Sequence, residues 1–209
     1  MTPKVIHRLS IYRRILLELQ AQGLAYLYSH QLAALAGGTA ALVRRDLMRI
    51  GFTGSPARGY EVTALIDAVG KVLDHPEGLS VALVGVGNLG RAVLAYFLGR
   101  KPNLTIVAAF DSDPALAGRV IHGCRCHAAS DLARICRELG VQVGIITVPA
   151  AAAQAAVDTM REAGVSSFVN FAPVALRLPP DVHVQEMDIT VTVEKAGYFA
   201  RRDGEAKPI

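Results

Sequence analysis

The sequence predicts an α/β protein in which a small, mainly helical N-terminal domain (residues 1–76) precedes a doubly wound domain (residues 77–188). Two observations carry this prediction. In the first third of the chain, apolar residues recur every three or four positions, as they do on one face of a helix. In the rest, short apolar runs alternate with helical segments, which is typical of a parallel sheet with helices on both faces. Proline and glycine between Asp74 and Gly78 mark the boundary.

Composition indicates a globular protein with a sizeable core. The chain has 209 residues, of which 52% are hydrophobic and 19% are charged. No apolar run reaches the roughly 20 residues that a membrane span requires. Residues 1–14 interleave basic and apolar side chains and lack the apolar stretch of a signal peptide. We therefore expect a soluble cytoplasmic protein that does not bind a membrane.

The excess positive charge lies in the N-terminal domain. Residues 1–75 contain nine lysines and arginines and five acidic residues, whereas residues 76–209 contain thirteen of each. A basic domain joined to a neutral one suggests a polyanionic partner, for which nucleic acid is the usual candidate. A merely solvated basic face is the alternative that charge alone leaves open.

Periodicity in the N-terminal domain predicts helices from the start of the chain. The first helix stops near Gly23 and carries one apolar stripe, formed by Leu9, Tyr12, Leu16 and Leu19. A very short strand is expected at residues 25–28. Ser29 can then cap a second, short helix, which ends at the glycine pair that begins with Gly37.

A third helix, capped by Thr39 and running through Ile50, is longer and more basic. This order of elements is that of a helix-turn-helix, whose last helix enters the major groove of DNA. Glycine and proline in residues 52–62 predict a β-hairpin wing. We predict that double-stranded DNA is contacted by Thr39, Arg44, Arg45, Arg49 and Arg58. Arginines that serve only solubility are the alternative. Asp46, which would repel phosphate, is expected to orient a neighbouring arginine or a backbone group.

The second domain is predicted to contain five apolar strands separated by helices, without internal repeats. The strands are expected at residues 80–84, 104–110, 143–148, 165–170 and 182–187, and the helices at 92–98 and 150–163.

A glycine-rich motif joins the first of these strands to its helix. Gly85, Gly87 and Gly90 form a G-x-G-x-x-G pattern, in which they provide a tight turn, close approach to a pyrophosphate and close packing of helix on strand. Asp111 follows 21 residues later, at the end of the next strand, where it can accept hydrogen bonds from a ribose. It would repel a 2′-phosphate, which favours NAD(H) over NADP(H). Asp113 is a nearby competitor, and a fold that binds another nucleotide or none is the alternative.

Other residues of the predicted NADH/NAD⁺ site come from the motif and from two later strand ends. They are Val86, Asn88, Leu89, Thr147, Val148, Pro149, Asn170 and Phe171. The nicotinamide side is mostly small and apolar, with neither a Tyr-x-x-x-Lys nor a His–Asp pair, and little chain remains for a substrate domain. We therefore predict a sensor without catalytic residues. A small NAD-dependent oxidoreductase and a nucleotide-binding subunit that docks onto a protein partner are the alternatives.

Three cysteines indicate neither a disulfide framework nor a metal site. Cys124 and Cys126 are two residues apart and near two histidines, but a second ligand pair for zinc is lacking. We therefore predict that no metal is bound.

The sequence resembles the Rex family of bacterial redox-sensing repressors over roughly residues 3–200. The segments that carry the resemblance are Arg8-Leu9, Tyr12-Arg13-Arg14, Arg44-Arg45-Asp46, Gly59-Tyr60, the run from Val84 to Gly90, Phe110-Asp111, the run from Thr147 to Ala150, the run from Asn170 to Pro173, and Met187-Asp188. The resemblance implies a winged-helix domain, a Rossmann domain, and a final segment (residues 189–209) whose helix swaps between the two subunits of a homodimer.

The resemblance also implies the activity. A Rex-type repressor binds palindromic operators, is released by NADH, and remains bound in the presence of NAD⁺. The family's switch implies that Arg14 pairs with Asp188 in one state, while Tyr96 competes for Asp188 in the other. The chain departs from the family in a less basic wing and in a recognition helix that ends on Met48-Arg49-Ile50 instead of aromatic residues.

Overall fold

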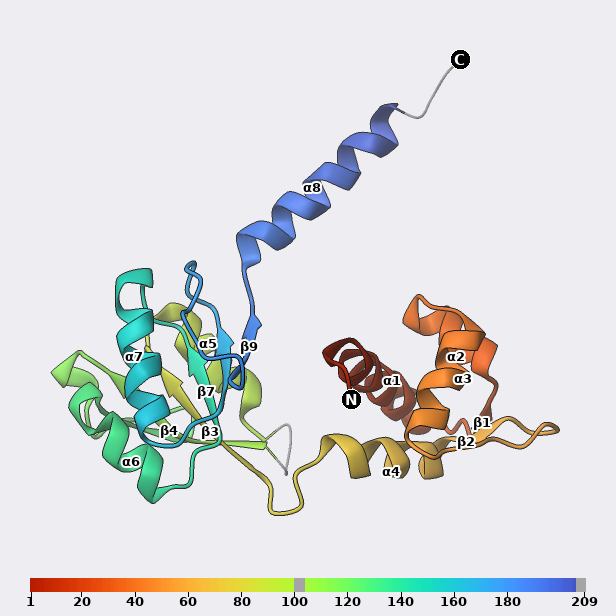
Figure 1. The fold of residues 1–209 in the computed structure, drawn as a ribbon, viewed down its shortest axis with the longest axis horizontal. Coiled ribbons are helices and arrows are strands. Elements are labelled where there is room, and N and C mark those ends of the chain that lie inside the picture. The colour runs from red at the N-terminus through yellow and green to blue at the C-terminus, as the bar shows by residue number, and fades with distance from the viewer. Residues whose placement is uncertain (100–103, 206–209) are drawn as a thin grey trace. The chain divides into compact units, whose positions relative to one another are not determined.

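The computed structural model describes residues 1–99 and 104–205. The chain forms two compact units, residues 1–76 and residues 77–209 (Figure 1). The last four residues of the predicted C-terminal segment, 206–209, lie outside the described part of the chain.

The N-terminal unit is built from helices that surround one apolar core. Its elements are α1 (Pro3–Ala21), β1 (Tyr26–Leu27), α2 (Ser29–Ala36), α3 (Ala40–Arg49), β2 (Tyr60–Glu61) and α4 (Val62–Leu73). The predicted stripe of α1 supplies Leu9, Tyr12 and Leu16 to this core, where they meet Val43 and Leu47 of α3. The predicted helix-turn-helix is confirmed, because α2 ends at Gly37 in the left-handed conformation and α3 follows directly.

Three local predictions for this unit were wrong or incomplete. Helix α2 is capped by Tyr28 instead of Ser29, since the Gln31 side chain accepts from the Tyr28 N–H at 2.7 Å. The wing is a narrow turn closed by Ser55 and Gly59, and its strand β2 pairs with β1 instead of with the other arm. Helix α4, which begins at Val62, the last residue of the predicted wing, was not predicted.

The second unit contains a seven-stranded sheet in the order β5-β6-β4-β3-β7-β8-β9. These strands are β3 (Leu79–Val84), β4 (Leu104–Asp111), β5 (Val120–Ile121), β6 (Cys124–Ala128), β7 (Val143–Ile146), β8 (Ser167–Asn170) and β9 (His183–Glu186). All neighbours pair in parallel except β5, which is antiparallel to β6. Without β5, the order is the 3-2-1-4-5-6 order of a Rossmann fold, so the predicted fold class is confirmed.

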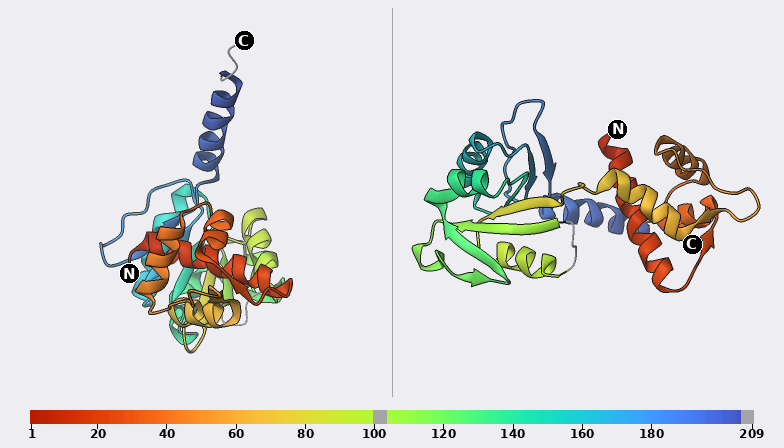
Figure 2. Two further views of the ribbon diagram at one scale, coloured as in Figure 1. Left: turned by 90° about the vertical axis from the view of Figure 1, so that its right-hand side faces the viewer. Right: turned by 90° about the horizontal axis from the view of Figure 1, so that it is seen from below.

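Helices cover both faces of this sheet (Figure 2). They are α5 (Asn88–Phe97), α6 (Leu132–Glu138) and α7 (Ala150–Glu162). Alternate residues of β3 point to opposite sides: Ala82 and Val84 pack with the side chains of α6 and α7, whereas Val81 and Leu83 pack with Leu94 of α5. The centre of the sheet is therefore buried on both faces, which explains why β3, β4 and β7 read as apolar runs.

Elements between the second and third predicted strands were missed. The short pair β5 and β6 carries cysteine, arginine and histidine instead of an apolar run, and α6 has only seven residues. Both fall below the length and periodicity that a sequence pattern can reveal. The predicted final helix is present as α8 (Ile189–Glu205).

Candidate functional site

A cleft of about 710 Å³ lies at the carboxyl ends of β3 and β7. The chain leaves the sheet in opposite directions on the two sides of this point, since β4 lies on one side of β3 and β7 on the other. In doubly wound folds, ligands bind at such a switch point. Nine of the twelve predicted cofactor residues line the cleft, namely Gly85, Gly87, Asn88, Leu89, Asp111, Thr147, Val148, Pro149 and Phe171.

The glycine-rich loop has the close packing that its sequence predicts. Gly85 has a φ of 99°, and a Cβ there would lie 2.8 Å from the backbone of Thr147. A Cβ on Gly90 would collide with the carbonyl oxygen of Gly85. A Cβ on Gly87, by contrast, would meet no atom within 4 Å. Gly85 and Gly90 are therefore required by the fold, whereas Gly87 keeps open a surface that faces the cleft.

Asp111 holds the loop as well as facing the cleft. One carboxylate oxygen accepts from the Val86 N–H at 2.6 Å, and the other accepts from the Asp113 N–H at 2.9 Å. Arg91, which the sequence analysis did not single out, donates to the Val86 carbonyl at 3.0 Å. Val86 therefore has a buried side chain and both backbone polar groups engaged, so its role in the loop is to fix the loop's shape.

Thr147 and Asn170 also act on the protein's own backbone. The Thr147 hydroxyl lies 2.7 Å from the carbonyl oxygen of Gly85, at the turn of the loop. Asn170 is buried and does not line the cleft: its amide donates to the Val174 carbonyl and to Glu186, and its oxygen accepts from the Ala172 N–H. Asn170 therefore fixes the loop after β8, which also carries Phe171.

One wall of the cleft was missed by the sequence analysis. It is formed by small residues on one face of α7, together with Ser112 and side chains near α6; the α7 residues are Ala152, Ala155, Ala156 and Thr159. Their spacing of three and four residues was the available signal. An alanine-rich helix beside the cleft leaves room that larger side chains would fill.

The residues of the cleft fit a dinucleotide. The first turn of α5 begins at Asn88, directly after the loop, and a helix N-terminus presents N–H groups and a positive dipole to phosphate. Each oxygen of Asp111 is used once, and a carboxylate accepts about four hydrogen bonds, so it retains acceptor capacity for ribose hydroxyls. The alanine wall and Phe171 provide an apolar surface for aromatic rings.

Helix α3 of the N-terminal unit presents a basic face away from its core. Thr39 caps the helix by accepting from the Leu42 N–H at 3.2 Å. The buried residues of α3 are Val43, Asp46 and Leu47, and the exposed ones are Ala41, Arg44, Arg45, Met48 and Arg49. The predicted arginines are therefore accessible on one side of the recognition helix.

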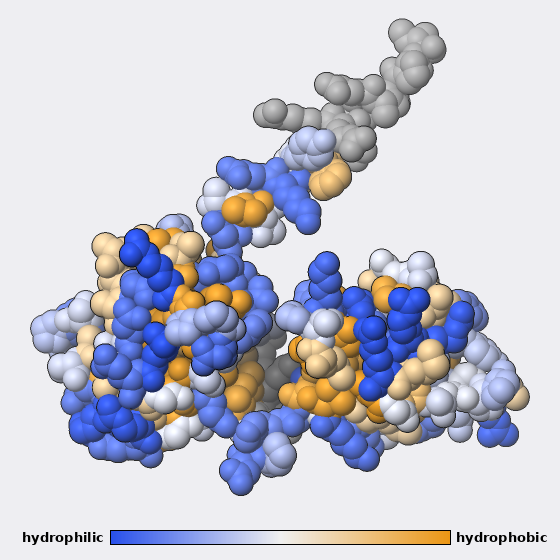
Figure 3. Space-filling model, in the orientation of Figure 1, coloured by the Kyte–Doolittle hydropathy of each residue, from blue (hydrophilic) through white to orange (hydrophobic). Residues whose placement is uncertain are grey.

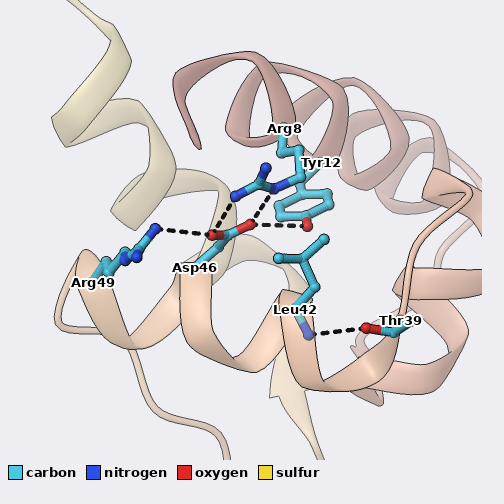
Figure 4. Close-up of polar contacts among 6 residues, drawn as sticks. All are labelled: Arg8, Tyr12, Thr39, Leu42, Asp46 and Arg49. Atoms are coloured by element: carbon cyan, nitrogen blue, oxygen red, sulfur yellow. Dashed lines mark hydrogen bonds and ion pairs between the residues drawn. The ribbon is translucent and has the colours of Figure 1, made fainter. Parts of the chain in front are cut away.

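Asp46 is held by a polar cluster beneath this face (Figure 4). Arg8 of α1 donates to both carboxylate oxygens, at 2.5 and 2.8 Å, and the Tyr12 hydroxyl donates at 3.3 Å. The hydrogen bonds from Arg8 lower the pKa of Asp46, and burial raises the pKa of Tyr12 to about 12. The expectation that Asp46 orients an arginine agrees with this contact, but the main partner is on another helix.

The predicted DNA-contacting arginines differ in the contacts that their side chains make within the protein. Arg44 donates to the Ser29 hydroxyl at 3.0 Å, and Arg49 lies 3.8 Å from Asp46 with half of its side chain exposed. Arg58, in the wing, lies 6.0 Å from the ring centre of Tyr26, within reach of a cation–π contact. Arg45 is exposed at the middle of α3.

The three residues implied for a switch lie on separate elements. Arg14 is exposed on α1, and Tyr96 is exposed on α5 beside the Phe97 ring. The carboxylate of Asp188 accepts from the Val191 N–H at 3.1 Å, so Asp188 caps the N-terminus of α8.

The cysteines are buried thiols. Burial raises the pKa of Cys124 and of Cys136 to about 11. Within residues 1–99 and 104–205, no three His, Cys, Asp or Glu side chains come close enough to share a metal ion. None of the helices in this part of the chain is long and apolar enough to cross a membrane.

The two units define a class of protein in which a winged helix is joined to a Rossmann fold. Residues 2–47 match the family described as "Putative DNA-binding protein N-terminus", and residues 77–174 match "CoA binding domain". The chain is 38% identical over 192 residues to the redox-sensing transcriptional repressor Rex 2 of Enterococcus faecalis, which covers 92% of this chain and 89% of that one. Rex of Listeria welshimeri matches with the same identity and coverage.

A solved structure supports the same assignment. The crystal structure of RSP, a Rex-family repressor, aligns with 98% of this chain and 96% of that one, with a TM-score of 0.88 and 27% sequence identity. The chain belongs to the Rex family of redox-sensing transcriptional repressors.

Proposed function

We propose that this protein is a redox-sensing repressor, which binds palindromic operator DNA as a homodimer and releases it when NADH occupies the cleft. One observation carries the proposal: a single chain joins an exposed basic recognition helix to a switch-point cleft behind a G-x-G-x-x-G loop. RSP, whose fold this chain shares, has been crystallised with NADH and with NAD⁺ and operator DNA.

In the proposed complex, α3 lies in the major groove. Arg45 is exposed and untethered to any neighbour that the structure records, and arginine is the usual reader of guanine. Arg44 is tied to the first residue of α2, the helix that crosses the DNA backbone in this motif, so a phosphate contact suits it. Arg49 and Arg58 are proposed as further phosphate contacts, and Thr39 as the cap that fixes the start of α3.

The cleft residues would hold the cofactor along its length. The α5 N-terminus would bind the pyrophosphate, and Asp111 would accept from the adenosine ribose and disfavour a 2′-phosphate. Thr147, Val148, Pro149 and Phe171 are proposed to surround the nicotinamide. The two redox forms of that ring differ by a hydride and one positive charge. Because the proposed surroundings are mainly apolar, desolvation favours the neutral, reduced form.

Helix α8 is proposed to swap between two subunits. Ile189, Val191, Val193, Tyr198 and Phe199 are exposed, and Figure 3 shows apolar side chains on the described surface of α8. A helix with this much exposed apolar surface requires a partner in solution.

The proposed switch biases the dimer between two states. NADH must bind more tightly to the state whose recognition helices no longer match successive major grooves. In this scheme Arg14 pairs with Asp188 in one state, and Tyr96 takes over Asp188 in the other. Replacing Asp188 by alanine should therefore weaken the NADH response more than it weakens DNA binding.

We further propose that the cleft is not catalytic. Its described lining contains no histidine, lysine or tyrosine that could exchange a proton with a substrate beside the nicotinamide. The named relatives are repressors, in keeping with this proposal.

Fluorescence anisotropy tests the proposal. A labelled palindromic duplex, selected by the protein from a randomised pool, is titrated with protein at fixed salt and then with NADH, NAD⁺ or NADPH. Release by NADH alone is the expected result. Binding that no nucleotide affects would remove the redox switch, and NADH consumption without DNA binding would favour an oxidoreductase.

Two glycine variants separate the cleft from the fold. Gly87→Ala places a methyl group in open space, so the fold should lose less than about 1 kcal/mol while NADH no longer approaches the loop. Gly90→Ala collides with the Gly85 carbonyl and should destabilise the unit itself, by about 1–3 kcal/mol or more. DNA that stays bound to Gly87→Ala at every NADH concentration would support the assignment, and a normal NADH response would contradict it.

A further inference from the structure

The centre of the exposed face of α3 is occupied by an apolar side chain. Met48 is 62% exposed. It lies one turn beyond Arg44 and Arg45, and two turns beyond Ala41, so these residues share one side of the helix. The opposite side is buried, at Val43 and Leu47. A groove that accepts this face therefore meets Met48 directly.

The charged neighbours of Met48 are drawn to its flanks. Arg44 is tied to Ser29 on one side, and Arg49 leans towards Asp46 on the other. Neither covers the methionine, which agrees with its exposure. The central strip of the recognition face is thus formed by Ala41, Arg45 and Met48.

The major groove offers few apolar groups to such a side chain. The C5-methyl of thymine is the apolar group that base pairs present there, and apolar side chains recognise it by contact. Methionine is unbranched and polarizable, and it adapts to small apolar surfaces. The rise of 1.5 Å per residue places Met48 about 4.5 Å along the helix from Arg45, roughly one to two base-pair steps, so both can act within one half-site.

We infer that Met48 is a specificity-determining residue that reads a thymine methyl group in each operator half-site. The inference rests on the proposed DNA-binding function and adds to it the identity of a base reader. Burial of one methyl group is worth about a factor of four in affinity, so a symmetric operator should lose roughly fifteenfold when both methyl groups are removed.

Deoxyuridine provides the test, because it lacks only the methyl group of thymine. In the selected palindromic duplex, each thymine is replaced in turn, in both half-sites, and anisotropy is measured at fixed salt. At one position, the replacement should lower the affinity of the unmodified protein roughly fifteenfold. The Met48→Ala variant should bind the unmodified duplex about as weakly as the unmodified protein binds the duplex with that replacement. The same replacement should lower the affinity of the variant by less than about twofold.

Leu35→Ala is the matched control, since Leu35 is an exposed apolar residue on α2 outside the recognition face. It should retain the full deoxyuridine effect, and circular dichroism should show that both variants are folded. The inference is overturned if no thymine matters, or if Met48→Ala responds to every replacement as the unmodified protein does. If the protein selects no duplex at all, the proposed DNA-binding function fails, and this inference fails with it.

Discussion

The ion pair between Arg8 and Asp46 predicts an asymmetric response to mutation. Asp46 is completely buried, whereas 24% of the Arg8 side chain is exposed. Removing one partner of a buried pair leaves the other charge without compensation, which typically costs about 3–5 kcal/mol. After Asp46→Ala, however, Arg8 can reach water, so we expect a loss of only about 2 kcal/mol. After Arg8→Ala, Asp46 stays buried, and a loss of about 3–4 kcal/mol is expected.

Tyrosine fluorescence can report this loss for the N-terminal unit. The chain has no tryptophan and six tyrosines, and four of the tyrosines lie in that unit. Urea unfolding followed by fluorescence and by circular dichroism gives the free energy of unfolding for each variant. Asp67→Ala, which removes an exposed carboxylate from α4, is the control and should cost no more than about 0.5 kcal/mol.

The order of the two losses in free energy shows which charge needs its partner. If Arg8→Ala costs less than Asp46→Ala, then the buried carboxylate is not the group that needs compensation. If both variants behave as Asp67→Ala does, then the pair does not stabilise α3 against α1. The double variant should lose less than the sum of the single ones, because neither charge then remains buried alone.

Three further predictions concern pH, the β8 loop and the thiols. Folding lowers the pKa of Asp46 from its ordinary value of 3.8. The stabilising effect of the Asp46 carboxylate is therefore complete above about pH 5 and is lost as the pH falls below 5. Urea midpoints measured between pH 7 and pH 3 should decline less in Asp46→Ala than in the unmodified protein. Asn170→Ala removes three hydrogen bonds and should destabilise the second unit by about 2–4 kcal/mol, measured by circular dichroism. Cys124 and Cys136, whose pKa rises from 9.0 to about 11, should have about a hundredfold less thiolate than exposed thiols, so mass spectrometry should find them alkylated by iodoacetamide only after unfolding.

Long and regular elements were predictable because their patterns repeat within the element. The apolar stripe of α1 and the runs of β3 and β4 are each set by local periodicity. Helix α4 was missed although its buried residues Val62, Leu65 and Val69 recur at helical spacing, and only the first of them lies within the predicted wing. The pair β5–β6 was missed because, at the edge of the sheet, polar residues such as Arg125 and His127 replace the apolar run.

Site residues were harder to interpret than to locate. A motif and its spacing identify Gly87 and Asp111 as members of the site, because Gly87 lies in the loop after β3 and Asp111 ends β4, beside the switch point. They do not reveal which polar groups the protein already uses. In the structure, the side-chain amide of Asn170 makes its three hydrogen bonds to backbone groups and to Glu186. The Asp111 carboxylate bonds to the loop and also faces the cleft. Such contacts join segments far apart in the sequence, such as the 25 residues between Val86 and Asp111, and no local pattern records them.

The double use of Asp111 has a consequence for the sensor. Its carboxylate fixes the loop through the Val86 N–H, so the acceptor proposed for the ribose is held in place before any cofactor arrives. A ligand group that meets a positioned acceptor loses less conformational entropy than one that must order it. Replacing Asp111 therefore removes the acceptor and loosens the loop together. For that reason the Gly87→Ala variant, which leaves the loop's own hydrogen bonds intact, isolates cofactor binding from loop order.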